Sequence, residues 1–351
     1  MHVENGAPVE DGSWDNYSEG NISYATSSHV GGYGSIATYR AEGGFVHGLG
    51  AKADGPLAVV FGTDTVASGR NSFVAGIGSQ ATATAATAIG SGTIASGVNS
   101  IALGKYTTAS GEGSFASGIG DSDSEHVIAS GKGSHAEGYR TEASGDYSHT
   151  EGYGRITTGG TGNTTYMPVI ASGIGAHAEG TGTIASGNYS HAEGRGLRIY
   201  YADGTIGTDN LQIASGMGSH VEGLGNEASG SYSHAEGSNN EVSGRCAHVE
   251  GSYNMASGAY SHAGGGEAIA SGDSSFVHST APVFGETPTY SQLDMLHSTA
   301  SGKYSFALGS SLLASGDYSW ASGRMSAATG LLSRADGHDS VAKGESSYAL
   351  G

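Results

Sequence analysis

The chain has 351 residues, including 63 glycines, and its 33 acidic against 14 basic residues give a formal net charge of −19. Leu, Ile, Val and Phe together make up 54 residues, too few to fill a conventional thick hydrophobic core. The acidic balance argues against nucleic acid and anionic membranes as partners, because both attract basic surfaces. A single cysteine, Cys246, excludes a disulfide framework.

Residues 1–27 precede the regular part of the chain, and we expect them to form an N-terminal cap or attachment segment. The opening MHVENGAPVEDG has no charged region followed by an apolar one, so we predict no signal peptide. No run of 18 apolar residues occurs anywhere, which predicts no transmembrane helix and no membrane insertion.

From residue 28 to residue 351 two short words alternate. The longer word has five residues, as in SFVAG at 72 and SHAEG at 134, and the shorter is usually ASG, as at 67 and 95. Where nothing is inserted, like words recur every 14 residues. A fixed period of this kind is typical of a solenoid. We therefore predict an all-β solenoid of about 20 coils, in which each word forms a strand and the glycines between words form the corners.

Alternation within the long word assigns the two faces of its strand. Positions one and three hold small residues, Ser followed by Ala, Thr or Val, and should face the inside of the coil. Positions two and four should face outward. Small inward residues allow two sheets to approach closely, so we expect a thin core of methyl groups and backbone ladders.

These words resemble the head repeat of trimeric autotransporter adhesins of the YadA type, and the SHAEG and ASG forms are most similar to repeats of bacteriophage tail-fibre and appendage proteins. The resemblance covers residues 28–351. It implies a left-handed parallel β-roll assembled as a parallel homotrimer, in which positions two and four of the long word face the threefold axis.

With that orientation, the first and last coils place apolar residues on the axis: Phe73, Ile101, Leu103, Phe115, Phe306, Leu308 and Trp320. The middle coils place there a ladder of His-x-Glu pairs: His135 and Glu137, His149 and Glu151, His177 and Glu179, His191 and Glu193, His220 and Glu222, His234 and Glu236, and His248 and Glu250. His262 continues the histidines, and Gly264 ends the glutamates.

Three interpretations of this ladder stay open. The pairs hydrogen-bond across the subunit interface, or they form a solvated charged face, or one or two layers bind a metal ion, because three His-x-Glu pairs supply six ligands. We predict no resident cofactor and no metal; the candidates for an axial ion are His135, Glu137, His191 and Glu193. No layer differs from its neighbours as an active site would, so we expect no enzymatic activity.

A second column lies one residue before the long word. It holds Tyr147, Tyr189, Tyr232, Tyr260, Tyr304 and Tyr318, and in other coils Asn71, Asn99, Gly113, Gly133, Gly175 and Gly218. Gly and Asn predict a corner with positive φ. The tyrosines either cover the sheet edge or a subunit seam, or they form platforms for sugar rings.

Four insertions, near 119–128, 155–169, 196–211 and 280–299, all fall between a long word and the next short word. The third predicts a β-hairpin about Asp203-Gly204. Insertions at one face of a solenoid often form its binding face; the alternative is that they brace the trimer. The candidate receptor contacts are Tyr166, Tyr200, Tyr201, Phe284 and Tyr290.

The function that we predict is structural and adhesive: a homotrimeric fibre segment of a phage or tailocin tail fibre or appendage that contacts a cell-surface glycan or protein. Adjoining fibre or particle proteins would continue it at both ends. The expected location is a virion, an extracellular appendage or a cell surface. The alternatives are the head of a bacterial trimeric autotransporter adhesin and a monomeric ligand- or ice-binding solenoid.

Overall fold

The computed structural model describes residues 2–4, 7–9, 14–15, 20–121, 126–158, 164–200, 206–280 and 297–351. The chain divides into two compact units, described separately below: unit 1 comprises Met1–Arg155 and Pro168–Gly175, and unit 2 comprises Ile156–Met167 and Ala176–Gly351. In the described ranges every regular element is a β-strand. They include no helix of the length and apolarity needed to cross a membrane.

Unit 1 consists of two parallel sheets, one built from long strands and one from short strands. The long strands are β3 (Trp14–Asp15), β5 (His29–Tyr33), β7 (Phe45–Leu49), β9 (Val59–Thr63), β11 (Phe73–Ile77), β13 (Thr87–Ser91), β15 (Ile101–Lys105), β17 (Phe115–Ile119), β19 (His135–Tyr139) and β21 (His149–Tyr153). The short strands are β4 (Ile22–Ser23), β6 (Ile36–Ala37), β8 (Lys52–Ala53), β10 (Val66–Ala67), β12 (Gln80–Ala81), β14 (Ile94–Ala95), β16 (Thr107–Ala109), β18 (Val127–Ala129), β20 (Thr141–Ala143) and β24 (Val169–Ala171).

Unit 2 repeats this arrangement. Its long strands are β25 (His177–Gly180), β27 (His191–Ala192), β31 (His220–Leu224), β33 (His234–Ser238), β35 (His248–Ser252), β37 (His262–Gly266), β39 (Phe276–Ser279), β41 (Phe306–Ser310), β43 (Trp320–Arg324), β45 (Arg334–His338) and β47 (Tyr348–Leu350). Its short strands are β26 (Thr183–Ala185), β30 (Gln212–Ala214), β32 (Glu227–Ala228), β34 (Glu241–Val242), β36 (Met255–Ala256), β38 (Ala268–Ala270), β40 (Ser298–Ala300), β42 (Leu313–Ala314), β44 (Ala327–Ala328) and β46 (Val341–Ala342).

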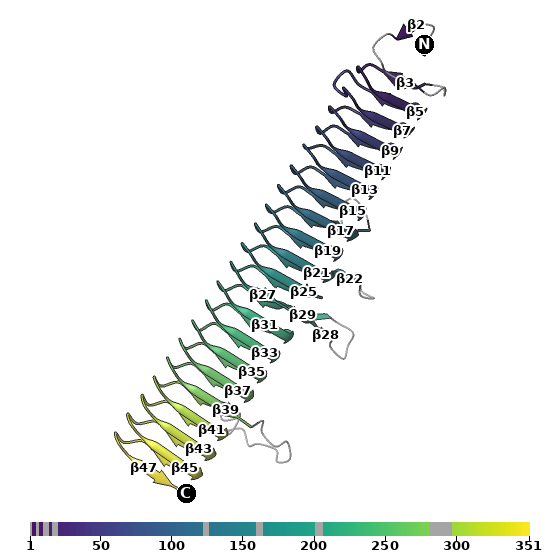
Figure 1. Cartoon of the computed structure of the whole chain (residues 1–351). Coiled ribbons are helices and arrows are strands. Elements are labelled where there is room, and N and C mark those ends of the chain that lie inside the picture. Colours follow the sequence, from purple (N-terminus) through teal and green to yellow (C-terminus); the bar gives the residue numbers. More distant parts are fainter. Residues whose placement is uncertain are drawn as a thin grey trace. The chain divides into compact units, whose positions relative to one another are not determined.

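Each strand pairs in parallel with the equivalent strand of the next coil, and the register follows the repeat. Phe73 pairs with Thr87 and His220 with His234, each 14 residues on. Within each unit the long strands therefore lie one above the next (Figure 1). The predicted solenoid of about 20 coils is confirmed. Its left-handed winding is what the resemblance to YadA-type heads implies.

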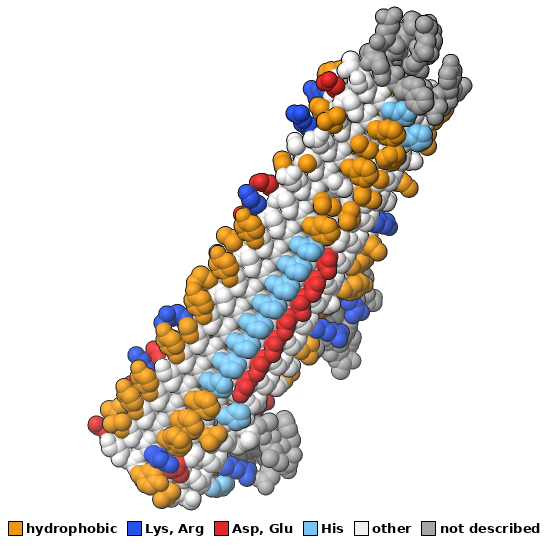
Figure 2. Space-filling view, in the orientation of Figure 1, with side chains coloured by type: hydrophobic (Ala, Val, Ile, Leu, Met, Phe, Trp, Pro, Cys, Tyr) orange, Lys and Arg blue, Asp and Glu red, His pale blue; other side chains and the backbone are white. Residues whose placement is uncertain are grey.

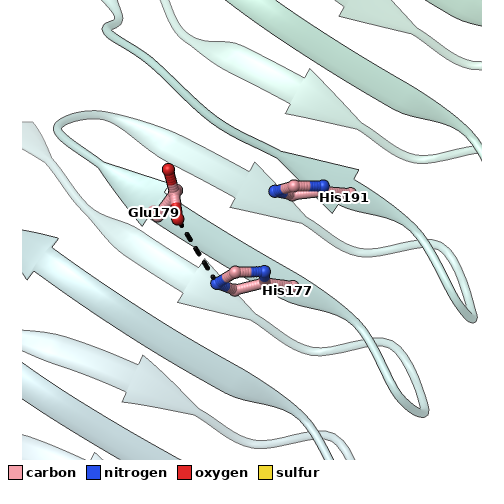
Figure 3. A group of neighbouring side chains, drawn as sticks. All are labelled: His177, Glu179 and His191. Carbon is pink, nitrogen blue, oxygen red and sulfur yellow. Dashed lines mark ion pairs between the residues drawn. The ribbon is translucent and has the colours of Figure 1, made fainter.

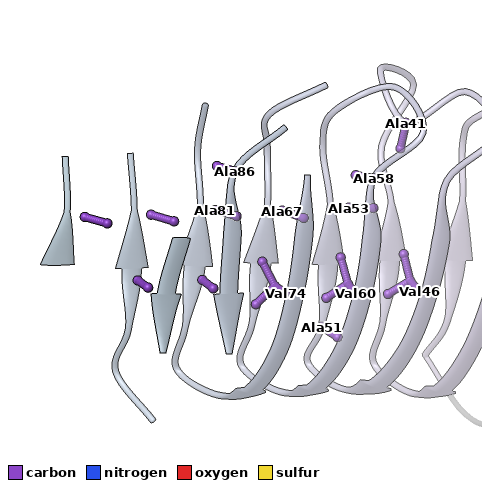
Figure 4. Close-up of a cluster of buried hydrophobic side chains, with 14 of the residues drawn as sticks. Ala41, Val46, Ala51, Ala53, Ala58, Val60, Ala67, Val74, Ala81 and Ala86 are labelled. Atoms are coloured by element: carbon purple, nitrogen blue, oxygen red, sulfur yellow. The ribbon is translucent and has the colours of Figure 1, made fainter. Parts of the chain in front are cut away.

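The core is thin, as the composition predicts. Ala and Val from both sheets meet inside the coils and are fully buried, as at Val46, Val60 and Val74 in unit 1 (Figure 4). On the long strands, positions one and three are buried in every word but the last, whereas positions two and four are half-buried or exposed except at Gly31 and Gly264. The predicted assignment of faces is confirmed.

The corners have the positive φ that the Gly and Asn residues before the long words predict. The residue before each long word has a positive φ, near +55° to +65°, whether it is Asn71, Gly218 or Tyr232. At the end of the long word, Gly237 has φ +100°, and a Cβ built on it would lie 2.1 Å from the carbonyl oxygen of Gly251 in the next coil. Only glycine fits where two backbones approach so closely.

At the N-terminus, β3 pairs with β5, and β4 pairs with β6, in the two sheets of unit 1. The strands of the solenoid thus begin before residue 28, within the segment expected to cap or attach the fibre. Whether residues 1–27 also perform that role stays a prediction.

Among the described residues, three two-stranded sheets lie outside the coils: β1 (His2–Glu4) with β2 (Ala7–Val9), β22 (Arg155–Thr158) with β23 (Thr164–Met167), and β28 (Leu197–Tyr200) with β29 (Ile206–Asn210). The last pair is antiparallel, with Leu197 opposite Asn210. It confirms the hairpin predicted in the third insertion, although its turn lies outside the described residues.

Candidate functional site

The most distinctive surface is the outward face of the long-strand sheet, which carries the His-x-Glu pairs. We call it the ladder face. In unit 1 the pairs come from β19 and β21, and in unit 2 from β25, β27, β31, β33 and β35. The histidine and glutamate side chains are half-buried. Figure 2 shows the row of histidines running beside the row of acidic residues.

The histidine rings stack on one another because the coils repeat in register. In unit 2 the ring centroids of successive histidines from His177 to His248 lie 4.7–4.9 Å apart with nearly parallel planes. In unit 1, His135 and His149 stack at 4.7 Å. These distances equal the spacing of neighbouring strands, so the backbone ladder itself sets the stack.

The stack continues into the apolar coils of unit 2. His248 meets His262 edge to face, and His262 stacks on Phe276 at 4.9 Å. Phe306 then lies 5.0 Å from Phe276 and 4.0 Å from Trp320. The ladder face of unit 2 thus presents an unbroken column of rings from His177 to Trp320.

Unit 1 carries a comparable apolar face. His29 stacks on Phe45 at 4.5 Å, and the tilted rings of Phe61 and Phe73 follow at 5.2 and 6.3 Å. The structure places the predicted axial residues Phe73, Ile101, Leu103 and Phe115 in unit 1, and Phe306, Leu308 and Trp320 in unit 2, on this outward face, half-buried or exposed. A role at a subunit axis stays a prediction.

Within single words the histidine and glutamate approach each other. The Nε2–Oε2 distance is 3.4 Å for His135 and Glu137, 3.7 Å for His177 and Glu179, and 3.6 Å for His191 and Glu193. Figure 3 shows His177 facing Glu179, with His191 in the next coil. These ion pairs are longer than a charge-assisted hydrogen bond.

Gly264 ends the glutamate row for a structural reason. The side chain of Glu250 turns toward the next coil, where its Oε1 lies 3.6 Å from Nε2 of His262. A Cβ at Gly264 would lie 3.1 Å from that Oε1 and 2.9 Å from Nδ1 of His278. The glycine leaves room for both side chains.

Two of the stacked histidines, His191 and His234, have a lowered pKa, which favours their neutral state. Burial, together with the neighbouring His177 and His220, lowers the pKa of His191 to about 4. Burial, together with the adjacent histidines, also lowers the pKa of His234. Imidazoles held in contact cannot all be charged, because like charges repel.

Three glutamates of unit 2, Glu193, Glu222 and Glu236, influence one another's pKa. Hydrogen bonds from Glu193 and Glu236 lower the pKa of Glu222. Burial raises the pKa of both Glu193 and Glu236, and their hydrogen bonds to Glu222 raise it further. Hydrogen bonds between neighbouring carboxyl groups thus shift their pKa values in opposite directions.

The ladder face also offers donor sets for a metal ion. Nitrogen and carboxylate atoms lie within 4.8 Å of one another in four groups, all in unit 2: His177, Glu179 and His191; His191, Glu193 and His220; Glu222, His234 and Glu236; and Glu236, His248 and Glu250. Among the candidates for an axial ion, His191 and Glu193 belong to such groups; His135 and Glu137 do not, within the described part of the chain. Imidazole and carboxylate suit divalent transition metals.

The structure describes fewer side chains in the insertions than on the ladder face. The candidate receptor contacts Tyr166, Tyr200, Tyr201, Phe284 and Tyr290 lie outside the residues whose side chains the structure describes. The first insertion is held to its own chain: Asp121 accepts hydrogen bonds from Tyr139 and Arg140, which raises the pKa of Tyr139 to about 12. These contacts lie within one chain, so the choice between receptor binding and bracing of the trimer stays a prediction.

Sequence reasoning missed a buried amide ladder in unit 2, made of Asn226, Asn240 and Asn254. Each side-chain nitrogen donates to two backbone carbonyls, and each side-chain oxygen accepts the backbone N–H of the equivalent residue one coil on. The spacing of 14 residues between these asparagines was the available signal.

Comparison with known proteins agrees with the repeat. The YadA head domain repeat matches residues 67–93, 95–120, 170–190 and 297–311. No curated protein matches the chain. The match confirms the resemblance to YadA-type heads; the likeness to tail-fibre proteins stays a prediction.

Proposed function

Since the chain carries repeats of the YadA head type, we propose that it forms a homotrimeric adhesive fibre segment whose ladder faces pack around a common axis. The repeat indicates an adhesin-like structural role at a surface. The trimer, the projection of the segment from a particle or cell, and the absence of catalysis are parts of the proposal.

The column of rings on the ladder face carries the proposal. Phe276, Phe306 and Trp320 are only half-buried although they stack continuously, and Leu308 beside them is 44% exposed. A long apolar surface of this kind marks a protein interface. A second and a third copy of the same chain present the same column in the same register, which suits heterologous contacts that close into a threefold ring.

The ladder itself also supports an interface. Half-buried carboxyl groups are costly unless they are paired, and hydrogen bonds along the row Glu193, Glu222 and Glu236 already shift the pKa values of these groups. Packing against neighbouring chains would supply further donors from the exposed sides of the histidine rings.

Sedimentation equilibrium tests the assembly. The expected mass is that of three chains of 34.9 kDa each. Leu308→Asp should reduce it to one chain, because a charge would enter the apolar interface. Leu331→Asp is the matched control: Leu331 is 43% exposed, and the equivalent residue one coil earlier is already Asp317. A wild-type protein that sediments as a monomer would refute the trimer.

Two settings compete for the fibre. The SHAEG words favour a phage or tailocin fibre, whereas the YadA head repeat favours the head of a bacterial autotransporter adhesin. Labelled protein applied to bacterial and to animal cells separates them: retention on bacteria supports the phage setting, and retention on animal cells supports the adhesin head. Retention on neither would argue against an adhesive role.

A further inference from the structure

A column of exposed tyrosines follows the corner that precedes each long strand of unit 2. We call it the tyrosine strip. From Tyr189 to Tyr318 this corner holds, in order, Tyr189, Gly218, Tyr232, Cys246, Tyr260, Ser274, Tyr304 and Tyr318, and in the last two coils it holds Leu332 and Ser346. Tyrosine and a small residue thus alternate from Tyr189 to Tyr304. Between 54% and 69% of each tyrosine on the strip is exposed.

Neither the backbone conformation nor packing in the core requires a tyrosine at this corner. The tyrosines of the strip have φ between +55° and +59°, a region that disfavours bulky residues and suits Gly or Asn. More than half of the surface of each of these tyrosines is exposed. A strained, exposed aromatic residue that recurs at one corner points to a binding function.

The rings lie along the stack of coils. The hydroxyl of Tyr232 lies 4.0 Å from Sδ of Met217 in the preceding coil, and its Cδ1 would be 3.0 Å from a Cβ at Gly218. The ring therefore covers the small residue of the preceding coil. At Tyr260 the guanidinium of Arg245 lies over the ring, with its Cζ 4.9 Å from the ring centroid. Figure 2 shows hydrophobic side chains, broken by charged ones, along the edge beside the histidine row.

Steric room does not impose the alternation. Tyr304 and Tyr318 occupy consecutive coils, and their rings stack at 5.0 Å with nearly parallel planes. Tyrosines could therefore follow one another in every coil. The small residues at Gly218, Cys246 and Ser274 instead give platforms that recur every second coil, or about 9–10 Å.

Exposed hydroxyl groups accompany the platforms. The serine of each ASG or VSG word, three residues before the strip position, is exposed in every coil of unit 2 from Ser186 to Ser315: Ser186, Ser215, Ser229, Ser243, Ser257, Ser271, Ser301 and Ser315. A linear, periodic row of aromatic faces and hydroxyls fits a linear, periodic polymer. The net charge of −19 disfavours a polyanion.

We infer that the tyrosine strip binds a neutral, extended glycan of equatorially linked hexoses, the geometry of cellulose and chitin chains. In such a chain each ring is about as long as one coil is high, and successive rings alternate in orientation. The same sugar face therefore recurs at every second residue and meets a tyrosine at every second coil, while the serines reach the hydroxyl groups. This inference rests on the proposed adhesive function and names its ligand.

Isothermal titration of the full chain with chitohexaose, cellohexaose and maltohexaose tests the inference. The first two are extended and equatorially linked, and maltohexaose is the bent control. We expect binding of at least one of the first two and none of maltohexaose. No binding of any, or equal binding of all three, would overturn the inference.

Paired variants locate the site. Tyr232→Asn with Tyr260→Asn should weaken binding about tenfold or more and keep the fold, because Asn71 and Asn99 occupy this corner in unit 1 with positive φ. Tyr33→Asn with Tyr253→Asn removes two equally exposed tyrosines elsewhere and should leave binding unchanged. Equal loss in both variants would overturn the inference.

Sedimentation of the same variants separates this inference from the proposed function. If the strip variant loses the trimer, its tyrosines form a subunit contact and the glycan site is refuted. If the wild-type chain is monomeric but binds the hexasaccharide through the strip, the trimer is refuted and the glycan site stands.

Discussion

Replacement of Asn240 tests the claim that a buried amide ladder stabilises the coils of unit 2. The Asn240 side chain donates to the carbonyl oxygens of Glu236 at 2.6 Å and Gly251 at 2.9 Å, and it accepts the N–H of Asn254 at 2.8 Å. It is buried, so water cannot replace these bonds. We expect Asn240→Ala to destabilise the protein strongly.

The magnitude follows from the three hydrogen bonds. At about 1 kcal/mol net for each bond, and more for a buried N–H left without an acceptor, the loss is about 3 kcal/mol or more. For a unit of this size that corresponds to a fall in Tm of about 6–12 °C. Asn240→Ser should cost less, because Ser326 at the equivalent position bonds the carbonyl of Gly337 at 3.1 Å and accepts the N–H of Ser340 at 3.3 Å.

Asn240→Asp is the decisive variant, because it keeps the shape of the side chain but replaces both donors by an oxygen that faces two carbonyl oxygens. We expect the order of Tm at pH 7 to be Asn, then Ser, then Ala, with Asp at or below Ala. Differential scanning calorimetry measures it. An Asp variant as stable as the wild type would refute the reasoning.

Three further expectations concern other contacts. Gly237→Ala should prevent folding of its coil, because a Cβ would lie 2.1 Å from a backbone oxygen, whereas Gly34→Ala, which has open space, should cost about 1–2 kcal/mol; equal Tm values would contradict this. Ala235→Leu should cost about 1–3 kcal/mol by overpacking, but Ala235→Val little, since valine occupies the equivalent position in both adjacent coils; similar losses would count against a tight core. The pKa of His191 is lowered from 6.5 to about 4, so its contribution to the stability of the folded protein is complete above pH 6.5 and is lost as the pH falls toward 4. Thermal melts of His191→Gln should therefore show a smaller fall in Tm over that pH range than the wild type. A fall in Tm equal to that of the wild type would contradict the prediction.

The repeat made most of the architecture predictable. In a parallel solenoid the neighbour of each residue is its equivalent one coil away, so a 14-residue period already specifies the strand pairing. The alternation of Ser, His, Ala and Glu in SHAEG assigned the buried and outward faces, and Asn71 and Gly218 identified the positive-φ corner. Each of these features depends on local spacing alone.

The tertiary structure decided the contacts that depend on the direction of side chains. The amide ladder of Asn226, Asn240 and Asn254, the turn of Glu250 toward His262, and the position of Tyr232 over Gly218 require rotamers and hydrogen-bond geometry that a pattern of letters does not contain. The lowered pKa of Glu222 likewise depends on its hydrogen bonds with Glu193 and Glu236.

The sequence by itself thus determined the coil, its register, its two faces and its corners, because these follow from periodicity and from the size and φ preferences of single residues. Only the tertiary structure decided which polar groups are satisfied inside, how far the rings of the ladder face are exposed, and how far the rings of the tyrosine strip are exposed. Those properties arise from atoms of adjacent coils that lie within a few ångströms of each other, where a small rotation of one side chain changes the partner.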